Sequence, residues 1–245
     1  MVDWKSSDTP FLGGPDTLEA KVVEHPFSFA GSGDRELNAL IVEAVNRMGG
    51  SGEQAEDRYQ RALAPLRERA GEVVDVVFAE YEAQPEESYL DRWSLVYLLS
   101  ELRDPGAVQP LNRIITSRIP AEKAKESHDV STVTEEVMIR TTAVEGLVRL
   151  SAEGVEEARK VLVRHAKHQR LSIRRACVQG LMETGEDADR KELRALLKER
   201  GDEGLLKIKR IDVREAPQAI GGRFVVSPDV KREPPPHDLG REGED

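Results

Sequence analysis

The sequence has one cysteine, few aromatic residues and no long apolar stretch. The single cysteine, Cys177, excludes an internal disulfide framework, and its place at a core position of a predicted helix indicates a small buried side chain. No segment approaches the roughly 18–20 consecutive apolar residues that a membrane-spanning helix requires. Residues 1–14 also lack the basic start and the apolar centre of a secretory signal, so we expect a cytoplasmic protein.

The composition is acidic and poor in aromatic residues, which limits the classes of fold and partner. The chain is 38% hydrophobic, 4% aromatic and 33% charged, with a formal net charge of −10. This balance suits an elongated helical array, whose surface is large for its mass. The negative charge argues against a general nucleic-acid binder, although it is compatible with a local basic site.

The motifs of common catalytic and metal sites are missing. The sequence contains no glycine-rich phosphate loop, nucleophile elbow or zinc-protease helix. Ser127, His128 and Asp129 are consecutive and cannot adopt the geometry of a catalytic triad. His165 and His168 could share a helix face, but no nearby Cys or Asp completes a metal site, so we expect a half-exposed pair. We therefore predict no catalytic residue, metal or cofactor.

One helical pattern recurs along the chain. It occupies three segments: Asp91–Leu102, Ile139–Leu150 (IRTTAVEGLVRL) and Ile173–Leu181 (IRRACVQGL). Each carries an arginine near its start, and Arg174 follows Arg140 by 34 residues. Such a period indicates a stack of helical hairpins. Because a buried guanidinium needs acceptors, we expect Arg92, Arg140 and Arg174 to pair with carboxylates or carbonyls at the repeat turns.

The pattern resembles bacterial HEAT-type repeats. A small apolar residue and Arg open a helix, small residues stand in its middle, and a Leu precedes the turn to a second helix. Asp104-Pro105-Gly106, followed by Ala107, resembles the inter-helix turn of those repeats. The resemblance covers about residues 55–200 and implies an all-α, HEAT-like solenoid of about four to five helical hairpins with extended N- and C-terminal arms.

Four segments of the chain differ in composition, and they define the expected organisation: an extended N-terminal arm at 1–33, a helical repeat domain at 34–203, a short β-prone capping segment at 204–227 and a disordered tail at 228–245. The arm either packs over the first helices or serves as a docking peptide. The polar stretch at 119–132 is an insertion within the repeats, either a mobile surface loop or a functional one.

Local signals place several helices. Asp34 is a plausible N-cap residue, Ser51 is expected to cap the second helix, and Gly71 separates that helix from the next. Residues 72–81 are rich in valine and could form a strand, but their position between helical hairpins favours a buried helix. A further helix is expected from Val155 to about His168.

A basic strip from Arg159 to Arg175 interrupts the acidic sequence with seven Lys or Arg, two His and no acidic residue. The predicted binding residues in it are Arg159, Lys160, Arg164, Lys167, Arg170 and Arg175. Two interpretations are open. The cations balance the helix dipole and acidic neighbours such as Glu156, or they bind an acidic protein surface or phosphates.

These observations predict a non-enzymatic adaptor that binds another protein, with an acidic surface, along one face of the helical array. An alternative is an enzyme of the HEAT-like bilin-lyase type, which requires a tetrapyrrole pocket; no distinctive motif for one is present. A second alternative is nucleic-acid binding through the strip at 159–175, as in the HEAT-like alkylpurine glycosylases. Those proteins look more basic, and their catalytic motif is not recognisable here.

Overall fold

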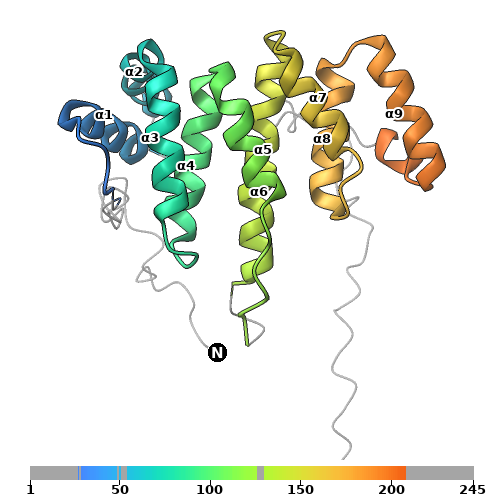
Figure 1. Cartoon of the computed structure of the whole chain (residues 1–245), viewed down its shortest axis with the longest axis horizontal. Coiled ribbons are helices and arrows are strands. Elements are labelled where there is room, and N and C mark those ends of the chain that lie inside the picture. The colour runs from blue at the N-terminus through green and yellow to red at the C-terminus, as the bar shows by residue number, and fades with distance from the viewer. Residues whose placement is uncertain (1–26, 28, 49, 51–53, 126–129, 208–245) are drawn as a thin grey trace, which may run out of the picture.

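The computed structural model describes residues 27, 29–48, 50, 54–125 and 130–207, and all regular elements within these ranges are helical. The α-helices are α1 (Arg35–Arg47), α2 (Ala55–Glu68), α3 (Ala70–Ala83), α4 (Tyr89–Leu102), α5 (Val108–Thr116), α6 (Thr132–Ala152), α7 (Glu156–His165), α8 (Leu171–Thr184) and α9 (Asp187–Arg200). Two short 3₁₀ helices are η2 (Pro105–Ala107) and η3 (Glu203–Lys207). The helices follow one another in chain order along the long axis of the molecule (Figure 1).

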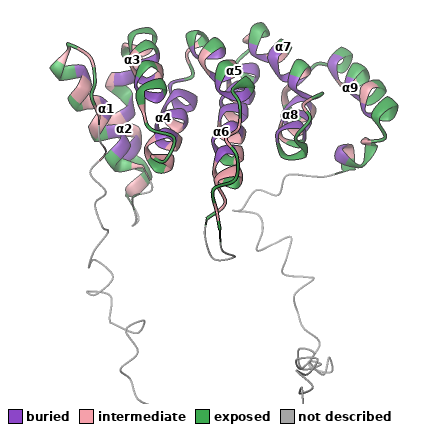
Figure 2. Ribbon diagram, turned by 60° about the horizontal axis from the view of Figure 1, so that its bottom comes forward, coloured by how far each residue is buried: buried purple, intermediate pink, exposed green. Residues whose placement is uncertain are grey.

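The helices pack against their neighbours in the way a helical repeat requires. Helices α4, α6 and α8 pack in sequence, α4 on α6 and α6 on α8, while α5 and α7 contact each other and both contact α6. Helix α6 is therefore covered on several sides, as its two apolar faces predict. Buried positions follow the inner sides of the helices from α1 to α9 (Figure 2).

Two glycines explain how closely the successive helices approach. Gly146 on α6 and Gly180 on α8 are 34 residues apart and stand at the same place in the repeat. A Cβ atom at Gly146 would lie 2.6 Å from Oγ of Ser100 on α4, and one at Gly180 would overlap Val148 on α6. The small residues in the middle of the repeat therefore allow each helix to pack directly on the preceding one.

Several local predictions are confirmed. Asp34 caps α1, because its Oδ1 accepts hydrogen bonds from the backbone N–H groups of Glu36 and Leu37. The valine-rich segment at 72–81 lies within helix α3, where burial outweighs its strand propensity. The proline turn forms η2, in which Asp104 accepts a hydrogen bond from the N–H of Gly106.

Three boundaries differ from the prediction. The junction of α2 and α3 is Arg69 rather than Gly71. The Arg69 side chain donates hydrogen bonds to Asp34 and Glu72, its N–H donates to the carbonyl of Leu66, and its carbonyl accepts from the N–H of Val73. Helix α7 ends at His165, so residues 166–170 form the turn to α8. Helix α2 begins at Ala55, and Ser51, its predicted cap, lies outside the described residues.

The expected β-prone segment at 204–227 is described only at its start, and that start is not a strand. Residues 204–207 belong to η3, which packs on α8 and α9 and buries Leu205. The burial of Leu205 and the hydrogen bond from its N–H to the carbonyl of Asp202 favour the helical turn. Residues 208–227 and the predicted disordered tail at 228–245 lie outside the described residues.

The N-terminal arm and the insertion are described in part. Residues 1–26 of the arm lie outside the described ranges; nearer α1, the N–H groups of Ala30 and Gly31 donate to the carboxylate of Glu80. In the insertion, Glu122 accepts hydrogen bonds from the N–H of Thr132 and the hydroxyl of Ser131. These bonds connect the two ends of the insertion, of which residues 126–129 are not described.

The helices in the described ranges are too short or too polar to cross a lipid bilayer.

Candidate functional site

The repeat arginines are held in place by acceptors, as predicted. Arg92 forms an ion pair with Glu136 and donates to the carbonyl of Glu86. Arg140 binds the same Glu136 carboxylate. Its Nη2 donates to the carbonyls of Ser117 and Arg118 at 3.2 and 3.1 Å, respectively. Such contacts orient these side chains and join the turns to the helices.

Arg174 follows the same plan one repeat later. Its Nη1 donates to the carbonyl of His168 at 2.6 Å and to that of Gln169 at 3.1 Å. Its Nε lies 3.0 Å from Oδ2 of Asp202 in an ion pair. Arg174 therefore fixes the backbone of the α7–α8 turn.

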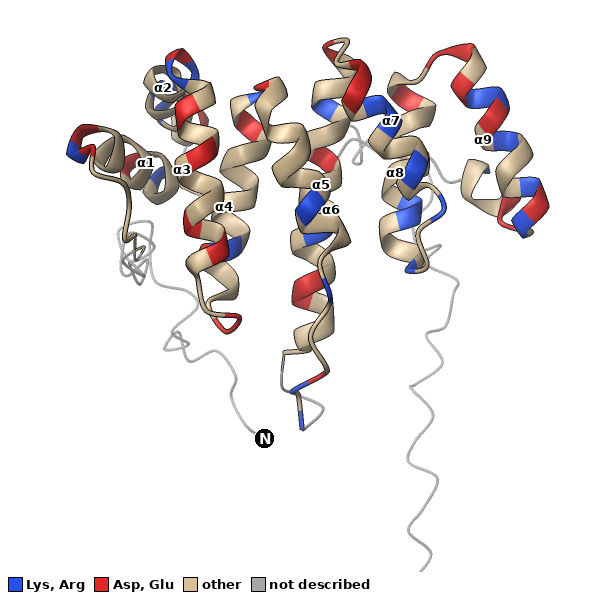
Figure 3. Cartoon of the chain, in the orientation of Figure 1, with Lys and Arg blue, Asp and Glu red and all other residues tan. Residues whose placement is uncertain are grey.

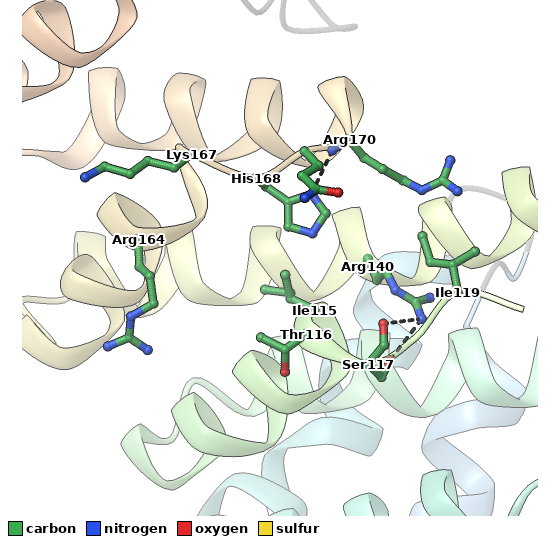
Figure 4. Close-up of a pocket in the computed structure, with 10 residues that line it drawn as sticks. Ile115, Thr116, Ser117, Ile119, Arg140, Arg164, Lys167, His168 and Arg170 are labelled. Atoms are coloured by element: carbon green, nitrogen blue, oxygen red, sulfur yellow. Dashed lines mark hydrogen bonds between the residues drawn. The ribbon is translucent and has the colours of Figure 1, made fainter. Parts of the chain in front are cut away.

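A hollow of about 470 Å³ lies beside this turn (Figure 4). Its walls come from the end of α5 and the residues that follow, from α6, and from α7 and the α7–α8 turn. Its lining residues are Ile115, Thr116, Ser117, Ile119, Arg140, Arg164, Lys167, His168, Gln169 and Arg170. None of these residues is acidic, and we call this site the basic hollow.

Three cations at the opening of the basic hollow are exposed. Arg164, Lys167 and Arg170 form no ion pair with any other residue in the described part of the chain. In Figure 4, Arg164 and Lys167 lie on one side of His168, and Arg170 extends to the other side. Figure 3 shows Lys and Arg gathered at the end of α7 and the start of α8. The cations therefore border the opening instead of converging on one point.

A buried charge cluster lies behind one wall of the basic hollow. Arg92, Glu136 and Arg140 are 8%, 2% and 1% exposed, and the single carboxylate faces two guanidinium groups. Burial alone would raise the pKa of Glu136, but hydrogen bonds from both arginines outweigh it and hold that pKa below its usual range. Glu136 is therefore ionised, and the cluster retains one excess positive charge.

The two histidines of the strip differ from the predicted half-exposed pair. His165 is buried, and its Nε2 lies 2.8 Å from Oδ1 of Asn112 on α5. Burial lowers the pKa of His165 to about 4, helped by the charges of His168 and Arg164. The pKa of His168 is also lowered, first by burial and then by nearby arginines such as Arg140. Both imidazoles are therefore neutral near pH 7, and the charge of the basic hollow comes from Arg and Lys.

No cluster of three or more His, Cys, Asp or Glu suitable for a metal ion occurs in the described ranges. Cys177 is fully buried on α8, and burial raises the pKa of its thiol well above the usual range. The prediction of a small buried side chain is confirmed for this residue.

The structure divides the six predicted binding residues of the strip. Arg164, Lys167 and Arg170 line the basic hollow. Arg159 does not, because its Nη1 lies 2.6 Å from Oδ1 of Asp189 and its guanidinium also binds Glu156. This side chain joins α7 to the start of α9.

The other two predicted binding residues also lie outside the basic hollow. Lys160 is 3.9 Å from the carboxylate of Glu157, one helical turn away. Arg175 is exposed on α8 and is not part of the lining.

Sequence reasoning missed the other wall of the basic hollow. Ile115, Ser117 and Ile119 precede the start of the strip by 40 to 44 residues in the sequence and carry no charge. Arg140 was recognised as a repeat arginine but not as a lining residue. Only the packing of α5 and α7 against α6 brings these groups together.

No protein-family model, curated protein or solved structure matches this chain.

Proposed function

We propose that this protein is a non-enzymatic adaptor, built as a HEAT-like solenoid, that binds an acidic segment of another protein at the basic hollow. The observation that carries this proposal is the group formed by Arg164, Lys167 and Arg170. These three cations surround one hollow whose lining residues include no acid. An acidic partner would supply the missing counter-charges.

The comparison with Arg159 supports this interpretation. Arg159 belongs to the same strip, but its charge is balanced by Asp189 and Glu156 within the molecule. The three cations of the basic hollow lack such partners among the described residues, and exposed charges contribute little to folding. A purely structural role leaves their mutual repulsion uncompensated.

The interpretation of the fold as a solenoid rests on the recurrence of the Arg residues and glycines. Arg92, Arg140 and Arg174 bind the turn before their own helix, and Gly146 and Gly180 allow close stacking. Repeat arrays of this kind present extended surfaces to other macromolecules. A protein partner is favoured over nucleic acid because the net charge of −10 repels a long polyanion at a distance.

The proposal is tested by reversing the three charges. A protein with Arg164→Glu, Lys167→Glu and Arg170→Glu should melt within a few degrees of the wild type, because these side chains are exposed. Partners are first captured from the native host and identified by mass spectrometry. Binding of the purified partner should then weaken at least tenfold, about 1.4 kcal/mol. Binding to the wild type should weaken as salt shortens the Debye length.

A matched control carries the same change in net charge elsewhere. Lys191, Arg194 and Lys198 are exposed on α9, away from the basic hollow. Reversing these three charges should leave partner affinity within about threefold of the wild type. Equal losses in both triple variants would indicate a general charge effect and contradict a site at the basic hollow.

A further inference from the structure

We propose that the segment bound in the basic hollow carries an apolar side chain between acidic residues, and that this side chain packs against Ile119. This inference rests on the proposed function and specifies the partner. Acidic residues on either side of the apolar one would pair with Arg164 and Lys167 at one side of the opening and with Arg170 at the other.

The first step is the distribution of apolar surface. Ile119 is partly exposed in the lining, whereas Ile115 also lines the basic hollow but is only 1% exposed. Figure 4 shows Ile115 and Thr116 below His168, and Ile119 near Arg140 and Ser117. An acidic chain without an apolar side chain would leave this part of the lining uncovered. A side chain that covers it gains the free energy of removing apolar area from water.

The second step is the direction of the cations. A single phosphate is held best by donors that converge on it, often in bidentate pairs. Arg164 and Arg170 instead extend away from each other on opposite sides of His168. Both terminal nitrogens of Arg140 are already occupied, Nη1 by Glu136 and Nη2 by Ser117 and the carbonyl of Arg118. Cations that lie on opposite sides of a hollow can pair with several carboxylates along an extended chain, whereas a single phosphate would reach only one side.

The third step is the charge behind the wall. The cluster of Arg92, Glu136 and Arg140 has one positive charge in excess and is buried, so its field is screened less than that of a surface charge. His168 is neutral near pH 7, so an apolar side chain can lie beside it without burying a charge. Anionic flanks and an apolar centre are therefore both compatible with the lining.

The volume agrees with a short segment. A hollow of about 470 Å³ is within the usual range of about 300–1,000 Å³ for ligand sites. It opens to solvent between the α7–α8 turn and the end of α5, so an extended chain can cross it without threading through the protein.

The experiment uses two synthetic peptides and the full chain. The probe peptide has the sequence Gly-Asp-Glu-Leu-Glu-Asp-Gly, and the control peptide has Gly in place of Leu. Binding is followed by NMR on protein labelled at the isoleucine methyl groups. We expect both peptides to bind and the Leu peptide to bind about fivefold more tightly. The Ile119 methyl resonance should shift with the Leu peptide and remain nearly unchanged with the Gly peptide.

A substitution at Ile119 completes a double-mutant cycle with the Leu-to-Gly change in the peptide. In Ile119→Ser the advantage of the Leu peptide should fall below twofold, while affinity for the Gly peptide stays the same. Val130→Ser is the matched control, because Val130 is 69% exposed and does not line the basic hollow. It should retain the fivefold advantage. If Ile119→Ser is unstable, the shift of the Ile119 methyl resonance in the wild type tests the same contact independently.

The outcomes separate this inference from the proposed function. One outcome is that both peptides bind equally well and that neither binds the triple variant of Arg164, Lys167 and Arg170. This result would overturn the apolar contact and leave the acidic-partner proposal intact. Binding that survives the triple reversal, or no binding at millimolar peptide, would overturn both. A phosphoserine peptide or an oligonucleotide that binds more tightly than the Leu peptide would identify a phosphate site and overturn the inference.

Discussion

At the scale of single residues, burial decides which ionisable groups of the basic strip carry charge. His165 lies next to Arg164 in the sequence, but it is buried against α5 while Arg164 faces solvent. One residue therefore contributes to the core and its neighbour to the basic hollow. A strip that appears uniform in charge contains two classes of side chain.

His165 should make the stability of the fold depend on pH. Its pKa is lowered from 6.5 to about 4, so between these values the unfolded chain binds a proton that the folded chain does not. The stabilisation is complete above pH 6.5 and is lost as the pH falls toward 4, by roughly 3 kcal/mol at most. Urea unfolding at pH 7 and pH 4.5 measures this loss.

The same measurement on His165→Gln isolates the contribution of the histidine, because the carboxylates titrate equally in both proteins. The variant should be less stable at pH 7 and should lose less stability on acidification. A variant that loses as much as the wild type would show that acid acts elsewhere.

Glu136 is the residue on which the buried arginines depend. Removing its charge with Glu136→Gln leaves Arg92 and Arg140 buried without a carboxylate. We expect a loss of about 3–5 kcal/mol in unfolding free energy, as for other broken buried ion pairs. Glu135→Gln, at the adjacent and more exposed position, should change stability by less than about 0.5 kcal/mol. Similar losses in the two variants would contradict this account of the cluster.

At the scale of helices, α6 organises the middle of the molecule. It packs against α4, α5, α7 and α8, and it supplies both Glu136 and Arg140. Its 21 residues make it the longest helix in the described ranges, and it is capped by Ser131, whose side chain accepts a hydrogen bond from the N–H of Thr134. The same helix therefore supports the core and one wall of the basic hollow.

The contact of α8 on α6 can be tested at Gly180. Alanine usually stabilises a helix relative to glycine by about 1 kcal/mol, but a Cβ at Gly180 would overlap Val148. Gly180→Ala should therefore destabilise the protein by about 1–3 kcal/mol. Val148→Ala in the same chain should recover part of the loss, because it makes room for the added methyl group.

Gly71 provides the control for helix propensity. It lies in the first turn of α3 with no atom near the position of a Cβ. Gly71→Ala should leave stability unchanged or increase it by up to about 1 kcal/mol. If Gly180→Ala behaves like Gly71→Ala in thermal or urea unfolding, close packing between α6 and α8 is contradicted.

At the scale of the whole molecule, the arrangement of the helices predicts an elongated particle. The helices are arranged in chain order along one axis (Figure 1). A compact domain of 245 residues has a radius of gyration of about 18 Å, and one of the length of residues 27–207 about 16 Å. Small-angle scattering should give larger values for both the full chain and this fragment. A value at or below the compact one for the fragment would exclude an open array.

The helices themselves could be predicted because their signals are local. The Asp34 cap and the proline turn at 104–106 each depend on nearby residues, and the recurrence of Arg140 and Arg174 after 34 residues is visible in the sequence itself. The errors at Arg69 and His165 fell at helix boundaries, where contacts made by the side chain or the turn outweigh local preference. The all-helical class of the described residues thus followed from the sequence.

The composition of the candidate site was decided by tertiary structure. Sequence determined that a basic strip exists, but not that Arg159 is neutralised by Asp189, 30 residues later, while Arg164 is left without an ion pair among the described residues. It also did not place Ile119 and Arg170 in the lining of the same hollow. Helical periodicity specifies the faces of one helix. Ion pairing and the lining of a hollow depend on distances between helices, and only their packing sets those distances.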